Sequence, residues 1–314
     1  MTADFIPEPT VATERPLTNA MTVDLEEYFQ VSAFESYIDP ERWPMLPSRV
    51  ERSIDVILTL FELWQVRATF FTLAWIAERQ PQMIRRIAAA GHEIASHGMR
   101  HVRANTQDWH AFRADVSRSR AILQDVSGQP VNGYRAASYS IGAANLWAHD
   151  VLAEAGYSYS SSIYPGNHDR YGMREAPRFP FRLQAGGILE IPITTLELAG
   201  RRLPCAGGGF FRLYPYAFSR WALRRVNRTE ARPALFYFHP WEVDPEQPRV
   251  PRLDARTRVR HYLNLKRMQP RLRRLLADFR WDRMDRVFPV QASENSTVAK
   301  ITASNAKVKE SVLS

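Results

Sequence analysis

Five polar residues whose side chains suit hydrolytic chemistry stand at or just beyond the ends of predicted strands. In a parallel βα barrel the carboxyl ends of the strands form one face, and active sites lie on that face. The residues are Asp24, His97, Arg135, Ser160 and His239. We therefore expect them to converge, although more than two hundred residues separate the first from the last.

Two of the histidines form a His-x-x-x-His pattern at His97 and His101. On a helical backbone this spacing would put both imidazoles on one face, where they could hold a divalent metal. Gly98 occupies the glutamate position of His-Glu-x-x-His, so a metalloprotease helix is not indicated. Together with the carboxylates of Asp24-Leu25-Glu26-Glu27, the pair predicts a two-histidine, one-carboxylate site with open metal positions.

His239 lies within the aromatic stretch Phe236-Tyr237-Phe238-His239-Pro240-Trp241. A histidine among aromatic side chains is often a packed core residue. Here it follows a strand too apolar to need it, and a proline comes directly after. The sequence leaves both interpretations open, a core histidine or a functional one at a strand end.

The elements that would position these residues alternate between strands and helices. Apolar and β-branched runs predict strands, and apolar residues at helical spacing predict helices between them. A capping box is expected from Ser48 to Glu51, at the start of the first helix. This alternation predicts an α/β fold with a parallel sheet, either a barrel or a doubly wound sheet. The expected strands are 20–24, 68–73, 92–96, 133–135, 157–160, 188–193 and 234–239, and the expected helices are 50–64, 81–91, 112–126, 146–154 and 216–228.

The barrel is favoured over a nucleotide-binding sheet because no glycine-rich turn follows the first strand; Leu25, Glu26 and Glu27 come directly after Asp24. The Gly207-Gly208-Gly209 run is not followed by the Lys-Ser/Thr of a phosphate loop, and predicts a lid or a tight turn instead.

The overall composition is that of a globular protein. The chain has 314 residues, 45% of them hydrophobic, and a net charge of +9. Its single cysteine, Cys205, excludes an internal disulfide framework and a thiolate zinc cluster. The apolar runs are much shorter than the ~20 residues of a membrane-spanning helix. Because no signal peptide is recognisable, we expect a cytoplasmic location.

Composition divides the chain into four expected segments. A flexible leader is expected over residues 1–20 and a disordered tail over residues 291–314. Between them we expect a barrel over residues 21–248 and a basic extension, packed on the barrel, over residues 249–290.

The basic extension has an uneven charge. From Arg249 to Arg286, 13 Lys and Arg residues stand against four aspartates, a difference of +9. The simplest explanation is a solvated helical face. Nucleic acid, anionic lipid and an acidic polymer remain alternative partners. Contact with a membrane surface is therefore compatible with the sequence, and nucleic acid is not expected.

Four segments, in this order, resemble the motifs of the polysaccharide deacetylases, carbohydrate esterase family four with its NodB homology domain. They are 22–27 (TVDLEE), 96–101 (SHGMRH), 133–138 (GYRAAS) and 238–240 (FHP). Longer stretches are similar to the branch found in exosortase (PEP-CTERM) exopolysaccharide loci: 24–35, 91–101, 167–172, 207–215 and 236–250. The resemblance covers about 21–288 and implies a distorted parallel (β/α) barrel with a basic C-terminal helical extension.

The resemblance also implies a metal centre. Glu26, His97 and His101 would hold a divalent metal, most often zinc in this family, with Glu27 as an alternative to Glu26. Asp24 would be the general base, taking a proton from the attacking water.

The remaining implied roles concern the substrate. Arg135 would orient the base, and the backbone amide near Ser138 would bind the oxyanion. His239 would be the general acid that protonates the leaving amine. From its place just after this residue, Trp241 is expected to form a wall of the cleft, whereas Tyr139 could line the groove or pack within its loop.

The resemblance implies a metal-dependent N-deacetylase that acts on N-acetylhexosamine units of an exopolysaccharide or its precursor and releases acetate. A related amidase acting on a small linear or cyclic amide would use the same residues. Ala137 and Ser160 replace a proline and an aspartate that are usual at these positions, which motivates a third hypothesis, a carbohydrate-binding or assembly protein that does not catalyse.

Overall fold

The computed structural model describes residues 5–7, 17–166, 172–184 and 187–290. The expected tail lies outside these residues, and so does most of the expected leader. Within the leader, β1 (Ile6–Pro7) pairs with β7 (Phe181–Arg182), and the first long strand begins at Thr18.

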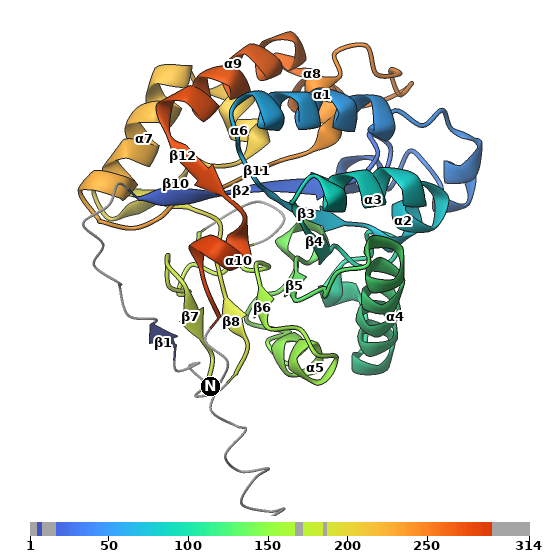
Figure 1. Cartoon of the computed structure of the whole chain (residues 1–314), viewed down its shortest axis with the longest axis horizontal. Coiled ribbons are helices and arrows are strands. Elements are labelled where there is room, and N and C mark those ends of the chain that lie inside the picture. Colours follow the sequence, from blue (N-terminus) through green and yellow to red (C-terminus); the bar gives the residue numbers. More distant parts are fainter. Residues whose placement is uncertain (1–4, 8–16, 167–171, 185–186, 291–314) are drawn as a thin grey trace, which may run out of the picture.

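A mostly parallel sheet forms the centre of the molecule (Figure 1). Its strands follow the spatial order β1-β7-β8-β6-β5-β4-β3-β2-β11, and β12 also pairs with β2. All neighbours from β8 to β11 are parallel, whereas β7 is antiparallel to β8 and to β1. The parallel strands are β2 (Thr18–Leu25), β3 (Thr69–Thr72), β4 (Glu93–Ser96), β5 (Gly133–Tyr134), β6 (Tyr159–Ser160), β8 (Leu189–Glu190), β11 (Leu235–Phe238) and β12 (Arg280–Asp282).

The fold prediction is confirmed in its α/β class and its parallel sheet. The order of strands is that of a barrel, with successive βα units as neighbours. Within the described residues, however, the hydrogen-bonded ladder ends at β11 and does not return to β7 or β1. A separate hairpin of β9 (Thr195–Leu198) and β10 (Arg201–Pro204) follows β8.

Helices surround the sheet, with α7, α9 and α1 along the top of Figure 1, α3 and α4 on the right and α5 below. They cover the apolar outer face of strands such as β3, in which every residue is buried. The helices are α1 (Val50–Leu63), α2 (Ala74–Arg79), α3 (Pro81–Ala89), α4 (Trp109–Ser127), α5 (Ala148–Glu154), α6 (Gly208–Leu213), α7 (Tyr216–Arg228), α8 (Ala255–Tyr262), α9 (Leu265–Asp278) and α10 (Met284–Val287).

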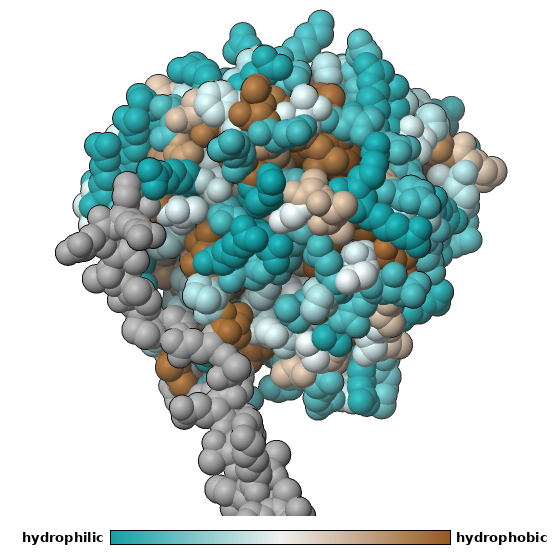
Figure 2. All heavy atoms as spheres, in the orientation of Figure 1, coloured by the Kyte–Doolittle hydropathy of each residue, from teal (hydrophilic) through white to brown (hydrophobic). Residues whose placement is uncertain are grey.

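The first helix shows why the amphipathic pattern was informative. In α1, Ile54, Ile57 and Phe61 recur at helical spacing, and all three are almost fully buried. On the face shown in Figure 2, by contrast, hydrophilic side chains cover most of the surface. Apolar side chains such as those of α1 pack instead in the core between the helices and the sheet.

Two local predictions were wrong. Ser48 does not cap α1 through a capping box, because its hydroxyl donates to Glu27 instead. The glycine run does not form a lid: Gly208 begins α6, and a Cβ there would lie 2.0 Å from Glu242 Oε1. Only a glycine allows α6 to approach Glu242 so closely.

Among the helices that the structure describes, none combines the length and the apolar character needed to cross a membrane.

Candidate active site

The expected convergence takes place at the carboxyl ends of the strands. Asp24 is the second-last residue of β2, and His97, Arg135 and His239 directly follow β4, β5 and β11. Asp24 Oδ1 accepts a hydrogen bond from Arg135 Nη1 at 2.5 Å. Its other oxygen lies 3.9 Å from His239 Nε2. Ser160 is buried at the end of β6, where its hydroxyl donates to Ser162.

Glu26, His97 and His101 form the cluster that could hold a metal. One ligand atom of each lies within 4.8 Å of the others, and all three residues are buried. His101 Nε2 is 3.1 Å from Glu26 Oε2. His97 directs Nδ1 at the carbonyl of Arg135, 2.7 Å away, so the proton sits on Nδ1 and Nε2 keeps a lone pair.

A loop, and not a helix, brings the two histidines together. His101 adopts a left-handed backbone with φ of 57°, and Gly98 has φ of 80°. A Cβ on Gly98 would lie 2.9 Å from Asp115 Oδ1, and the same carboxylate accepts from the amide of Met99. The expectation that depended on a helical backbone was therefore wrong, although the pair of imidazoles does form.

The protonation of this cluster fits a divalent cation. Burial lowers the pKa of His97 to about 4 and that of His101 well below its usual value, so both imidazoles are neutral and free to donate lone pairs. Burial also raises the pKa of Glu26 to about 7. Glu26 Oε2 is buried and accepts no hydrogen bond from the described residues. A cation would supply the positive charge that this oxygen lacks.

Glu27 has a different partner. Its carboxylate accepts from the hydroxyl of Ser48 and from the backbone amides of Arg49 and Val50. These are the unpaired amides of the first turn of α1, which a carboxylate stabilises. Glu27 is not among the clustered ligand atoms, so the structure favours Glu26 at the metal position.

Arg135 is fully buried and connects several strands. Besides Asp24 it donates to the hydroxyl of Thr22 at 2.9 Å and to Ser161, through its carbonyl at 3.3 Å and its hydroxyl at 3.1 Å. Although burial works against the charge, Asp24 raises the pKa of Arg135. Residue 160 is a serine and not an aspartate, but the charge of the guanidinium is still neutralised, because Asp24 itself pairs with it.

His239 is held from behind by a carboxylate. Its Nδ1 lies 2.8 Å from Glu242 Oε1, while Nε2 faces Glu26 Oε1 at 3.6 Å. Burial lowers the pKa of His239, but the negative charges of Glu26 and Glu242 outweigh this effect and raise the pKa to about 9. Glu242 is in turn paired with buried Arg212 at 2.6 Å. Although burial raises it, Arg212 lowers the pKa of Glu242 to about 2.

Trp241 lies directly beside His239. It stacks against the rings of His239 and His261, with centroids 5.0 and 4.2 Å away, and donates its indole N–H to Glu26 Oε1 at 3.1 Å. His261 belongs to α8, and its backbone carbonyl accepts from Arg212 at 2.9 Å. The basic extension thus packs directly against the residues behind His239.

Ser138 and Tyr139 lie on a strained turn after β5. Both adopt left-handed backbone angles, with φ of 54° and 51°. The hydroxyl of Ser138 shares a hydrogen bond with that of Ser32 at 2.5 Å. The Tyr139 ring packs edge-on against Tyr237, 5.2 Å away. The cost of this backbone indicates that the surroundings fix the turn.

Four participants were missed by the sequence analysis: Thr22, Glu190, Arg212 and Glu242. For two of them the sequence did hold a signal, because Thr22 and Glu190 are polar residues within otherwise apolar stretches. Glu242 follows His239 by three residues, a spacing at which side chains meet in a turn. Arg212, within an aromatic stretch of α6, carries no such local signal.

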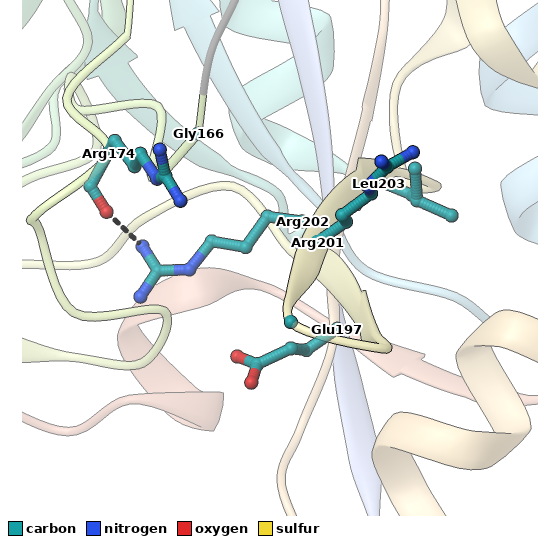
Figure 3. Close-up of a pocket in the computed structure, with 7 residues that line it drawn as sticks. Gly166, Arg174, Glu197, Arg201, Arg202 and Leu203 are labelled. Atoms are coloured by element: carbon teal, nitrogen blue, oxygen red, sulfur yellow. Dashed lines mark hydrogen bonds between the residues drawn. The ribbon is translucent and has the colours of Figure 1, made fainter.

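A separate hollow lies beside the β9–β10 hairpin. It has a volume of about 510 Å³ and is lined by Gly166, Arg174, Glu197, Gly200, Arg201, Arg202 and Leu203. Figure 3 shows Arg202 extended across it to the carbonyl of Arg174, a hydrogen bond of 2.7 Å. None of the residues expected to be catalytic lines it.

Two family profiles match the chain. Residues 47–160 match "Polysaccharide deacetylase", and residues 161–289 match "Domain of unknown function (DUF3473)". The first contains His97, His101 and Arg135, and the second contains His239. Asp24 and Glu26 precede both.

Similar proteins agree with the first profile. The chain is 27% identical over 108 residues to a chitooligosaccharide deacetylase of Bradyrhizobium sp. (strain ANU 289), a match that covers 34% of this chain and 47% of that protein. It is 32% identical over 113 residues to a chitooligosaccharide deacetylase of Sinorhizobium fredii (strain NBRC 101917 / NGR234), covering 34% and 48%. The chain thus spans about half the length of these relatives.

A solved structure with the same fold extends over nearly the whole chain. It is assigned as a polysaccharide deacetylase from Mycobacterium smegmatis, with a TM-score of 0.58 and 18% identity, and covers 90% of this chain and 93% of that one. At this identity the likeness establishes the fold alone.

Proposed function

We propose that this chain, whose residues 47–160 match the polysaccharide deacetylase family, is a metal-dependent N-deacetylase. The observation that carries the proposal is that the Glu26–His97–His101 cluster meets Asp24 and His239 at the carboxyl ends of the strands. The reaction would be hydrolysis of an acetamide, with water as co-reactant and acetate and a free amine as products.

In this proposal Glu26, His97 and His101 hold a divalent cation, and zinc suits them because it prefers imidazole and carboxylate ligands. When bound, such a cation polarises an acetamide carbonyl and lowers the pKa of water. The neutral imidazoles and the buried carboxylate described above are the ligand forms that it needs.

The remaining residues move the protons. Asp24 accepts a proton from the attacking water, and Arg135 holds its carboxylate in place through Oδ1. His239 donates a proton to the departing amine nitrogen, with its ring held by Glu242 through Nδ1. The left-handed turn at Ser138 presents a backbone amide for the developing oxyanion.

For the substrate, we propose N-acetylhexosamine units of an exopolysaccharide or its precursor. The curated relatives carry chitooligosaccharide deacetylase as their name, which supports an N-acetylated saccharide. Trp241 and Tyr139 would contact a sugar ring only with the small edges that they leave exposed, because both side chains are almost fully buried and Trp241 stacks on His239 and His261.

The test is acetate release from N-acetylglucosamine oligomers by the purified chain, with and without chelator, alongside its metal content. About one equivalent of zinc and chelator-sensitive release of acetate are expected. Bound metal with ring opening of small imides but no acetate would point to a related amidase. Saccharide binding without any turnover at saturating zinc would point to a non-catalytic role, and either result overturns the proposal.

The basic extension would complement an anionic surface. Exposed cations gather on α8 and α9, among them Arg258, Lys266, Arg267 and Arg273. We extend the proposal to contact with anionic lipid through this face, a contact that salt would screen. Flotation with phosphatidylglycerol vesicles at low salt, compared with phosphatidylcholine vesicles, tests it; equal partition to both would refute it.

A further inference from the structure

A buried carboxylate on the neighbouring strand β8 connects to the site through hydrogen bonds. Glu190 has no exposed surface. Its Oε1 accepts from the backbone amides of Ser162 and Ile163, both at 2.7 Å, and its Oε2 lies 2.9 Å from Nε2 of buried His149. Although burial raises it, the bond from His149 lowers the pKa of the Glu190 carboxyl.

The segment that Glu190 holds is the one that grips the arginine. The hydroxyl of Ser162 accepts from the amide of Ala136 at 2.9 Å. The neighbouring Ser161 accepts from Arg135 twice, with its carbonyl from Nε and with its hydroxyl from Nη2. Both the backbone after Arg135 and its guanidinium therefore depend on where residues 161–163 lie.

Arg135 then reaches two different functional groups. Its Nη1 donates to Asp24 at 2.5 Å, and its backbone carbonyl accepts from Nδ1 of His97 at 2.7 Å. A shift of this one residue would displace the base and turn a metal-ligand ring at the same time. Groups that orient a ligand in this way commonly affect both metal affinity and activity.

We propose that Glu190 is a positioning residue for the active site. It holds residues 161–163 in register with Arg135, and through Arg135 it sets the place of both Asp24 and His97. The inference rests on the proposed function for the chemical roles of Asp24 and His97. The hydrogen bonds that connect Glu190 to Arg135 through residues 161–163 do not depend on it.

The test compares Glu190→Ala with Glu190→Gln. Alanine leaves two buried amides without an acceptor, whereas the glutamine carbonyl can still receive both. We expect Glu190→Ala to lower kcat and zinc affinity each by about 10–100-fold, with KM changed by less than about threefold. Glu190→Gln should restore most of both. Zinc affinity is measured with the metal alone, and kcat by acetate release.

The matched control is Glu93→Gln, which alters a buried carboxylate on β4 that bonds Thr69 and Tyr159 at the opposite end of the strand. It should leave kcat and zinc affinity unchanged. If Glu190→Ala keeps both at wild-type values, or if Glu93→Gln lowers them equally, the positioning role is refuted.

Two further measurements keep the outcomes separate. If Glu190→Ala does not fold, Ser161→Ala removes the hydroxyl contact to Arg135 with little other change, and should lower kcat in the same direction; unchanged kcat would refute the inference. If wild-type protein binds zinc but releases no acetate, the proposed function fails, while zinc affinity in the Glu190 variants still tests the positioning role.

Discussion

Arg135 Nη1 lies 2.5 Å from Asp24 Oδ1, a contact between two buried residues that are 111 positions apart in the chain. The guanidinium donates at the same time to Thr22 and Ser161, so the carboxylate has one orientation. A lysine has a single ammonium group in place of this planar fork and cannot reach all three partners.

Arg135→Lys should therefore lower kcat by about a hundredfold, within the range that a positioned general base contributes. Acetate release at saturating substrate measures it, and circular dichroism monitors folding. Arg113→Lys on the exposed face of α4 is the control and should change nothing. Wild-type turnover in Arg135→Lys would show that Asp24 needs no such partner.

His97→Ala and His101→Ala should abolish metal retention and turnover together, because each removes one of three clustered ligands. Metal content is measured by elemental analysis and turnover by acetate release. His110→Ala, an exposed histidine of α4, should retain both. An active alanine variant with full metal content would contradict the assignment of the ligands.

Substitutions of the adjacent residues Glu26 and Glu27 should have different effects on metal binding and on stability. Glu26→Gln should lose the metal, whereas Glu27→Gln should keep it and destabilise the fold by about 0.3–1 kcal/mol, because its carbonyl still accepts from the first amides of α1 but the negative charge there is lost. Metal analysis and urea unfolding of the metal-free proteins provide the two readouts. Metal loss in Glu27→Gln with full retention in Glu26→Gln would reverse the assignment.

Gly208→Ala should impair catalysis through Glu242. Its new methyl group would lie 2.0 Å from Glu242 Oε1, and Arg212 and His239 restrict where that carboxylate can go. We expect lower kcat, as His239 is displaced. Gly209→Ala is the matched control, since no atom lies within 4 Å of its Cβ position. Equal activity of the two variants would show that Glu242 is not constrained.

Glu93 should make stability depend on pH. Burial, with Asp285 nearby, raises the pKa of Glu93 to about 7, from 4.5, despite bonds from Thr69 and Tyr159 and the charge of Arg283. The folded state therefore holds this proton more tightly than the unfolded state does. Stability falls as pH rises from about 4.5 to 7.

Glu93→Gln should remove this slope, which amounts to about 1–3 kcal/mol across the interval. Urea midpoints at several pH values measure the difference between wild type and variant. A difference that stays constant from pH 4.5 to 8 would contradict the raised pKa.

The parallel α/β fold was predictable from the sequence because it depends on local patterns. The residues at the ends of strands, such as Asp24 and His239, were predictable for the same reason, because the carboxyl ends of parallel strands all lie at the same end of the sheet. The partners of these residues were not. Ser48 has the spacing of a helix cap, but Glu27, 21 positions earlier, supplies the oxygen.

Long-range contacts also decide the second layer of the site. Glu190 lies in an apolar strand and Arg212 in an aromatic helix, and neither sequence context says which distant group it meets. Only packing brings Glu190 to the segment beside Arg135, or Arg212 to Glu242. The sequence predicted the pairing of His97 with His101 but assumed a helical backbone, because spacing alone does not distinguish a helix from a tight loop.

The position of β2 has a consequence for biosynthesis. β2 pairs with β3, which follows it closely in the chain, whereas β11 and β12, which also pair with β2, are made last among the described strands. Translation at about 5–20 residues per second leaves about 7–28 s between His101 and His239, 239 − 101 = 138 residues later. The nascent chain thus carries all three proposed metal ligands, beside an open strand edge, before the proposed acid His239 emerges from the ribosome. During that interval the unpaired edge of β2 is a template on which another chain could pair, until β11 is made.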